Sequence, residues 1–235
     1  MNEFQRILYR FDLPDASTKT LEFSFDPADF RMSNPPLEDP PFWTELKFNQ
    51  CANCPLDPSV NAHCPAALQM TSALEPLKAL ASFDTVGVTV IQAERTMYAE
   101  TTAQQAMSSV LGLIMATAGC PWTDHLRPMA RFHLPFASEA ETVYRSICMF
   151  LLAREISDAD EPPGFEALEE LYRNLHVVSR DMSRRLGAAT RTDPARNAMA
   201  LLDSYTILLP HALEHSLEEL KPLFGAWRTK RIPPI

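Results

Sequence analysis

Glycine is scarce in this chain, with 6 glycines among 235 residues against 20 prolines. Neither G-x-G-x-x-G nor G-x4-G-K-[ST] occurs, so the sequence offers no glycine-rich loop for nucleotide phosphates. Positive charge is also in short supply, since 21 Lys and Arg residues face 30 Asp and Glu residues and leave a net charge of −9. An acidic chain is poorly suited to bind a phosphate backbone, so we expect no nucleic-acid partner.

A long apolar run is missing as well. The longest such stretch, Val110–Ala118, is much shorter than the roughly 20 residues that a membrane-spanning helix requires. The first residues, Met1–Arg6, do not resemble a signal peptide. The cysteine count of 5 is odd, and nothing marks the chain as secreted. We therefore expect a cytoplasmic protein with no membrane partner, whose thiols stay reduced or hold a metal.

The most informative feature that is present is a set of Cys-Pro steps. Four of the 5 cysteines lie in three short motifs, which are Cys51-Ala52-Asn53-Cys54-Pro55, His63-Cys64-Pro65 and Gly119-Cys120-Pro121. Two thiolates at C-x2-C spacing can bind one metal ion from a single turn, and a loop rich in turn-forming residues can return a third cysteine to that pair. Cys120, which ends an apolar helical stretch, is the best candidate for a fourth ligand. The predicted metal ligands are Cys51, Cys54, Cys64 and Cys120.

Zinc is the expected metal, because four thiolates suit a closed tetrahedral structural site. A 4Fe-4S cluster is the main alternative, since it also takes four cysteines and since a proline can directly follow a cluster cysteine. The same residues could instead carry out thiol redox chemistry or be ordinary buried thiols. All of these alternatives are compatible with the local sequence.

Three histidines could replace a missing thiolate, namely His63, His125 and His133. If only the first three cysteines bind the metal, an open fourth position would allow metal-dependent catalysis with His125 or His133 as acid or base. The apolar setting of His133 is more typical of a hydrogen-bonded core histidine. The remaining cysteine, Cys148, lies in an amphipathic helical pattern and is predicted to be a core residue.

Alternating apolar and polar residues predict a small antiparallel sheet. Ile7, Tyr9 and Phe11 alternate with polar neighbours in the first strand of a β-hairpin predicted over residues 4–25. A further strand is predicted over residues 85–98, either continuous or bent into two. With helical patterns in most of the remaining chain, the fold class is α+β, a small antiparallel sheet packed with a mainly helical C-terminal half.

The C-terminal half is predicted to be helical from Ser138 onward. Ser138 and Glu141 make a capping box, and apolar residues seven apart over 165–186 predict a helix-packing seam. A last helix is predicted from 193 to about 223. We expect the last two helices to form an antiparallel hairpin that binds a protein partner or a second copy of the chain.

The helix predicted over 165–186 carries basic residues near its end. Arg180, Arg184 and Arg185 would complement the negative end of the helix dipole, and Gly187 is expected to terminate the helix.

These patterns divide the chain into three parts. Residues 1–137 form an α/β metal-binding region with the hairpin and the cysteine-rich loop. Residues 138–225 form a C-terminal helical bundle or hairpin, which could share one core with the first part. Residues 226–235 are expected to be a mobile tail.

Two further features bear on a possible ligand site. The helix predicted over 103–118 has Ser108, Gly112 and Ala116 spaced by four, which favours close packing of another element, with a ligand groove as the alternative. Residues 121–137 combine aromatic, basic and histidine side chains. If the protein has a ligand pocket, we expect it there. The alternative for residues 121–137 is a packed connector that covers the metal site.

Several of these motifs together resemble an uncharacterised bacterial domain family over roughly residues 1–225. The segments that carry the resemblance are Gln50–Leu56, His63-Cys64-Pro65, Ala118–Pro121, Arg127–Ala130 and Leu134–Ala137. The resemblance implies a bacterial cytoplasmic protein and supports treating the Cys-Pro steps as one set. It implies no catalytic residue.

The sequence therefore predicts a cytoplasmic metal-binding protein with a structural four-cysteine site and a helical surface for assembly or a partner. An iron–sulfur or thiol redox protein is one alternative. A metal-dependent enzyme with one open coordination position is another, although no nucleophile–base–acid set is evident.

Overall fold

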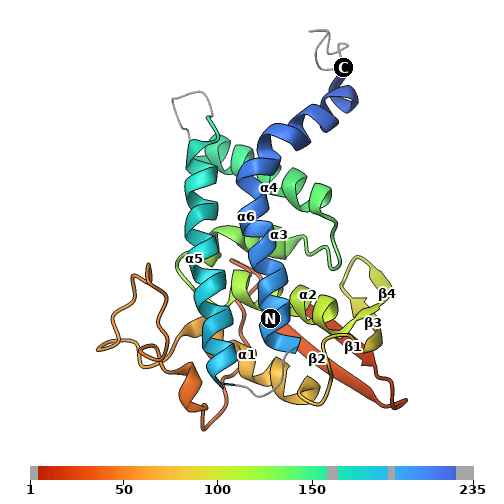
Figure 1. The fold of residues 1–235 in the computed structure, drawn as a ribbon, viewed down its shortest axis with the longest axis vertical. Coiled ribbons are helices and arrows are strands. Elements are labelled where there is room, and N and C mark those ends of the chain that lie inside the picture. The colour runs from red at the N-terminus through yellow and green to blue at the C-terminus, as the bar shows by residue number, and fades with distance from the viewer. Residues whose placement is uncertain (1–4, 158–163, 190–193, 226–235) are drawn as a thin grey trace.

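The computed structural model describes residues 5–157, 164–189 and 194–225, apart from the side chains of residues 208–219. Its strands are β1 (Gln5–Asp12), β2 (Thr18–Phe25), β3 (Thr85–Ile91) and β4 (Thr96–Thr102). Its helices are α1 (Pro65–Leu74), α2 (Ala103–Thr117), α3 (Arg127–Arg131), α4 (Glu139–Ile156), α5 (Glu166–Ala189) and α6 (Pro194–Leu220). Short 3-10 helices lie at Phe42–Thr44, Glu75–Leu77, Thr123–Leu126 and Lys221–Phe224. The predicted α+β fold class is confirmed (Figure 1).

The strands form one antiparallel sheet in the order β2-β1-β3-β4. The predicted hairpin is β1–β2, in which Tyr9 pairs with Leu21, and Tyr9 pairs with Val90 of β3 on the other side. Alternate residues of β1, β2 and β3 are buried on one face, as the alternation predicts. The opposite face carries exposed residues such as Tyr98, so the sheet buries one side only.

The segment predicted over 85–98, either as one strand or as two, contains two strands. The backbone N–H of Gln92 donates to the carbonyl oxygen of Arg95 at 2.9 Å, and this turn reverses the chain between β3 and β4. β4 then continues to Thr102, beyond the predicted end. The turn contains neither Gly nor Pro, which explains why its position was not evident from the sequence.

Helix α2 lies across the buried face of the sheet and forms the centre of the core. Thr102 caps it by accepting the N–H of Gln105 at 3.4 Å, and Leu111 and Ile114 are completely buried. The helix ends before Gly119, whose positive φ of +88° favours glycine. Because 11 of its 15 residues are buried, α2 contacts the sheet, α1 and the C-terminal helices.

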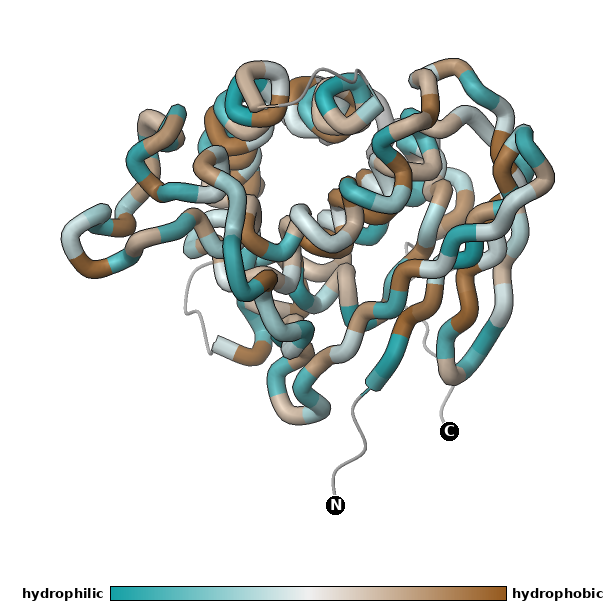
Figure 2. Tube along the Cα trace, turned by 90° about the horizontal axis from the view of Figure 1, so that it is seen from below, coloured by the Kyte–Doolittle hydropathy of each residue, from teal (hydrophilic) through white to brown (hydrophobic). Residues whose placement is uncertain are grey.

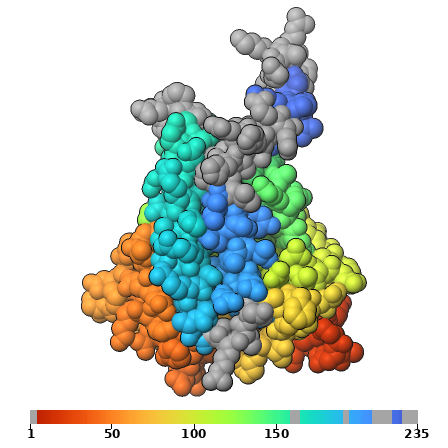
Figure 3. All heavy atoms as spheres, viewed as in Figure 1, coloured from red at the N-terminus to blue at the C-terminus, as the bar shows by residue number. Residues whose placement is uncertain are grey.

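Helices α5 and α6 run antiparallel and lie side by side, as predicted (Figures 1 and 3). The capping box at the start of α4 is also confirmed, since Ser138 and Glu141 exchange both hydrogen bonds. The expectation that Gly187 ends α5 is wrong, because the helix continues to Ala189. A Cβ at Gly187 would lie 3.1 Å from Cδ of Arg196, so this glycine permits close packing of α6.

The main core crosses the boundary predicted at residue 137. It contains residues of the sheet, α1 and α2 together with Val178 and Met182 of α5 and Met199 of α6. A smaller cluster around Val143 and Tyr172 joins α4 to α5. None of the helices described here is long and apolar enough to cross a membrane. The predicted mobile tail, residues 226–235, lies outside the described residues.

Candidate metal centre

Cys51 and Cys54 bracket a tight turn. The backbone N–H of Cys54 donates to the carbonyl oxygen of Cys51 at 3.0 Å. Further along the loop, Oδ1 of Asp57 accepts the N–H of Ser59 at 2.8 Å and stabilises a second turn. The segment of residues 50–64 lies on the side of the molecule opposite the strands in both Figure 1 and Figure 2. The loop therefore has the turn-rich form that its sequence predicts.

Cys64 immediately precedes helix α1. Its N–H donates to the carbonyl oxygen of Thr44 at 2.8 Å, and Pro65 is the first helical residue, as predicted. Burial raises the pKa of the Cys64 thiol, whereas the amide of Ala67 and the guanidinium of Arg185 act in the opposite direction. A helix N-terminus and a nearby cation both favour the thiolate that a metal requires.

The third segment reaches the C-x2-C turn through a tryptophan. Cys120 follows Gly119 at the end of α2, and Nε1 of Trp122 donates to the carbonyl oxygen of Asn53 at 2.8 Å. Asn53 is one of the two residues between the paired cysteines. Residues almost 70 positions apart in the chain are thus joined next to the predicted ligands.

The structure brings the four predicted ligands into one region. Burial, followed by the thiols of Cys64 and Cys120, raises the pKa of Cys51 to about 12, and Asp181 and Cys54 act in the same direction. All four are free thiols that pack against the main core. Among the residues that the structure describes, however, no three His, Cys, Asp or Glu side chains are arranged to hold a metal ion. The backbone gathers the ligand segments, while the side chains do not form a coordination sphere.

Helix α5 fastens the C-x2-C turn through a carboxylate that the sequence reasoning missed. Asp181 is fully buried and accepts the N–H of Ala52 at 2.8 Å. It also accepts hydrogen bonds from Arg180, at 3.0 Å, and from Arg184. Burial alone would raise the pKa of Asp181, but these hydrogen bonds outweigh burial and lower it.

Arg185, one turn further along α5, holds the segment that precedes the turn. Its side chain is completely buried. Nη1 donates to the carbonyl oxygens of Trp43 and Glu45, both at 2.7 Å, and Nη2 donates to that of Leu46 at 3.1 Å. The guanidinium also lies 5.9 Å from the centre of the Phe48 ring. One side chain therefore satisfies three backbone carbonyls of a loop.

The spacing of residues along α5 gives a sequence signal for both Asp181 and Arg185. Val178, Asp181, Met182 and Arg185 follow the i, i+3, i+4, i+7 pattern of a buried helix face, and all four are buried. A carboxylate and a guanidinium on an apolar stripe indicate buried polar partners. The expected role of these arginines at the negative end of the helix dipole does not require them to be buried. It therefore did not predict that Arg185 is buried.

Two of the alternative histidines have partners of their own. Nδ1 of His63 lies 2.8 Å from Oγ1 of Thr44, and Nδ1 of exposed His125 lies 3.2 Å from the carbonyl oxygen of Trp122. Neither belongs to a metal-holding group among the described residues.

His133 is a hydrogen-bonded core histidine, as its apolar setting predicts. It is 8% exposed, and its Nε2 lies 2.5 Å from Oη of Tyr9, which in turn lies 2.8 Å from Oγ of Ser109. Burial, with a smaller effect from Arg145, lowers the pKa of His133 to about 3. The imidazole is therefore neutral near pH 7.

The depressed pKa of His133 predicts a specific dependence of stability on pH. In the unfolded chain its pKa is about 6.5, so between pH 6.5 and 3 only the unfolded state takes up this proton. The stability contributed by neutral His133 is fully present above pH 6.5 and is lost as the pH falls. From pH 7 to pH 5 the free energy of unfolding should drop by about 2 kcal/mol more in the wild type than in His133→Gln.

Urea unfolding at both pH values measures this difference. Exposed His125→Gln is the matched control and should keep the wild-type dependence on pH. Parallel curves for the wild type and His133→Gln would show that the buried imidazole does not resist protonation.

The prediction for Cys148 is wrong. Cys148 is exposed on α4, whereas Val143, Ser146 and Ile147 form the buried face of that helix. Cys148 follows Ile147 directly, so a step of about 100° carries it off the buried stripe. It is a suitable control in experiments on the other cysteines.

The segment predicted as the place of a ligand pocket does line a cavity. Leu126, Met129, His133 and Phe136 contribute to a cavity of about 380 Å³, together with residues of α2, α4, α5 and α6. The preceding residues pack under the cysteine loop through Trp122. One part of residues 121–137 thus lines a cavity and another packs against the cysteine loop, while a ligand site and a metal site both stay predictions.

The comparisons with known proteins give one match. The family described as "Domain of unknown function (DUF6901)" matches residues 7–225. No curated protein and no solved structure matches the chain. The match covers nearly the whole sequence and confirms the resemblance to an uncharacterised domain family. The chain belongs to the family of the Domain of unknown function DUF6901.

Proposed function

We propose that this is a metal-binding protein in which one zinc ion, held by four cysteines, fastens the cysteine loop to the helical core. The proposed ligands are Cys51, Cys54, Cys64 and Cys120. The observation that carries the proposal is the convergence of the three Cys-Pro segments. The bond from Trp122 to Asn53 places the Cys120 segment against the C-x2-C turn, and α1 begins beside them at Cys64.

The donor set supports zinc as the metal, with an iron–sulfur cluster as the alternative. Four thiolates favour zinc in a closed tetrahedral site, and they leave no position for water or a substrate. The thiols are not arranged for coordination in the described structure, so binding would turn them inward by rotation about the Cα–Cβ bonds. The backbone of the three segments would need little movement, because hydrogen bonds to α5 and Trp122 already hold it.

The surroundings support a structural role for the ion. Arg185 and Asp181 keep two sides of the loop against α5, and each is fully buried. A metal would connect the same loop to α2 through Cys120 and to α1 through Cys64. A reducing cytoplasm would keep these thiols available for a metal.

Replacing one ligand tests the proposal. Cys54→Ser should lose the bound metal and unfold at a lower temperature, because loss of a ligand removes folding free energy. Cys148→Ser removes an exposed thiol and should keep both the metal and the unfolding temperature. Metal content by mass spectrometry and thermal unfolding measure the two effects. If Cys54→Ser keeps the wild-type metal content and unfolding temperature, the four-cysteine site does not exist.

A further inference from the structure

The cavity near residues 126–137 is separate from the cysteine site and has the size of a small-molecule site. Its volume is about 380 Å³, within the roughly 300–1,000 Å³ range of ligand pockets. Among the α2 residues that line it are three with small side chains spaced by four, Ser108, Gly112 and Ala116, which leave room between the helices. Gly112 also allows α6 to pack closely, because a Cβ added at this position would lie 3.5 Å from Cδ2 of Leu202. The small-residue row therefore serves both close packing and the cavity.

Most of the lining is apolar, with side chains from several helices. Leu113 and Met115 come from α2, Met129 from α3 and Leu175 from α5. Such walls suit the hydrocarbon part of a ligand, since burying apolar surface is favourable by about 25 cal/mol per Å². The body of a bound molecule should therefore be apolar.

At one end of the cavity lies the guanidinium of Arg145, which uses only some of its hydrogen-bond donors. Nη2 of Arg145 donates to the carbonyl oxygens of Met129, at 2.6 Å, and Phe132, at 2.9 Å. These bonds fix the guanidinium, whereas no acceptor for Nη1 or Nε and no ion pair for Arg145 occurs within the described part of the chain. The nearest acid along the helix, Glu141, instead accepts hydrogen bonds from Ser138.

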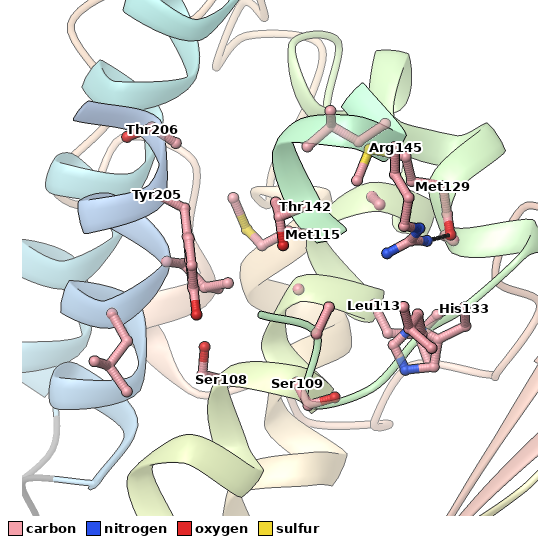
Figure 4. A pocket seen from close by; sticks show the side chains of 18 of the residues that line it. Ser108, Ser109, Leu113, Met115, Met129, His133, Thr142, Arg145, Tyr205 and Thr206 are labelled. Carbon is pink, nitrogen blue, oxygen red and sulfur yellow. Dashed lines mark hydrogen bonds between the residues drawn. The ribbon is translucent and has the colours of Figure 1, made fainter. Parts of the chain in front are cut away.

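Glu141, one turn earlier on α4, lies close enough to act on the charge of Arg145 but forms no ion pair with it, and the other groups beside Arg145 are uncharged. Figure 4 shows Arg145 and His133 on the same side of the cavity. Burial keeps His133 neutral, and Tyr9 behind it is also uncharged, because burial raises its pKa. A fixed guanidinium in a partly dry site is well suited to an anion such as a carboxylate, to which Nη1 can donate a charge-assisted hydrogen bond.

Hydroxyl groups on the other side of the cavity also lack partners. Figure 4 shows the hydroxyls of Ser108 and Tyr205 pointing toward one another, yet no hydrogen bond links either to any residue in the described ranges. Ser108 is 8% exposed and Tyr205 is half-buried. This side of the cavity therefore offers hydroxyl groups that a ligand can contact.

We propose that the cavity binds a small organic carboxylate with an apolar body, whose carboxylate pairs with Arg145. The hydrocarbon part lies along Leu113 and Met115 and extends toward Ser108 and Tyr205. The metal proposal is independent of this one, because none of its four cysteines lines the cavity.

Calorimetric titration with octanoate and with 1-octanol tests the proposal on the full chain. The two probes share an alkyl chain and differ in the head group. Octanoate should bind about 10- to 100-fold more tightly than 1-octanol, the ratio expected for a charge-assisted hydrogen-bonded pair. In Arg145→Gln the affinity for octanoate should fall to that for 1-octanol, while 1-octanol binds as before and so reports that the cavity is intact. Arg173→Gln, at an exposed arginine of α5, is the matched control and should change neither affinity.

A second variant tests the location. Ser108→Leu places a larger apolar side chain in the cavity and should abolish binding of both probes, whereas Ser72→Leu on the exposed side of α1 should not. Three results would overturn the proposal: no octanoate binding to the wild type, equal octanoate binding to the wild type and Arg145→Gln, or undiminished binding to folded Ser108→Leu. The arginine comparison does not depend on whether Ser108→Leu folds.

Discussion

Replacement of Arg185 by methionine should lower the free energy of unfolding by about 3–5 kcal/mol. Methionine retains most of the apolar stem but removes every donor. The carbonyl oxygens of Trp43, Glu45 and Leu46 would then lose the hydrogen bonds that the guanidinium supplies at 2.7, 2.7 and 3.1 Å. The carbonyl of Glu45 still accepts the N–H of Phe48 at 3.1 Å. Leaving the acceptors of Trp43 and Leu46 unsatisfied costs about 1–3 kcal/mol each, although nearby water can recover part of this.

Arg173→Met is the matched control for this substitution. Arg173 lies on the same helix, but its side chain is 58% exposed and pairs with Glu170, whose side chain is 62% exposed. Exposed ion pairs contribute about 0–1 kcal/mol, so the control should be nearly neutral. Urea unfolding of the two variants gives the comparison. Equal effects of the two substitutions would mean that Arg185 does not hold the cysteine loop.

If zinc is bound as proposed, its removal from the wild-type protein should destabilise the cysteine loop more than replacement of Arg185 does. Structural zinc supplies about 10–16 kcal/mol of apparent folding free energy in small zinc peptides. In a protein with its own core, zinc should supply a smaller but still substantial part of the folding free energy. The four cysteines are a small part of the core around α2, most of which comes from the sheet and the helices, so the helices should stay folded after chelation. The segment of residues 50–64 should become sensitive to proteases, because it would keep only its hydrogen bonds to α5 and Trp122.

Limited proteolysis before and after treatment with a zinc chelator measures this effect. Cleavage within residues 50–64 should appear only after chelation, and added zinc should suppress it. The same treatment of Cys54→Ser is the control, since that variant should be cleaved with or without the chelator. An unchanged cleavage pattern in the wild type would contradict a metal-fastened loop.

The parts of the fold that follow from local periodicity could be predicted from the sequence. Alternation at Ile7, Tyr9 and Phe11 predicts β1, and the Ser138–Glu141 box predicts the start of α4. The turn at Gln92–Arg95 could not be placed in this way, because it contains no Gly or Pro and depends on pairing between β3 and β4.

The candidate sites show the same division. The Cys-Pro motifs indicate which segments converge, because sequence spacing limits where a short loop can return. The roles of Asp181 and Arg185 depend on which face of α5 meets the loop. The spacing of the apolar residues marks this face, but a charged residue within the spacing is not by itself predicted to be buried. The composition of residues 121–137 and the small residues of α2 indicated where a cavity could lie, whereas its volume and its other walls depend on how the helices pack, which no local pattern encodes.

Metal analysis of the purified protein shows whether the four cysteines hold a zinc ion. The protein should be prepared without oxygen or chelators, and its metal content and visible absorption should be measured on the same sample. We expect one zinc ion per chain and no visible absorption band. Iron with sulfide and a visible band would replace zinc with an iron–sulfur cluster on the same ligands. A chain that contains no metal would contradict the account and identify the four cysteines as clustered free thiols.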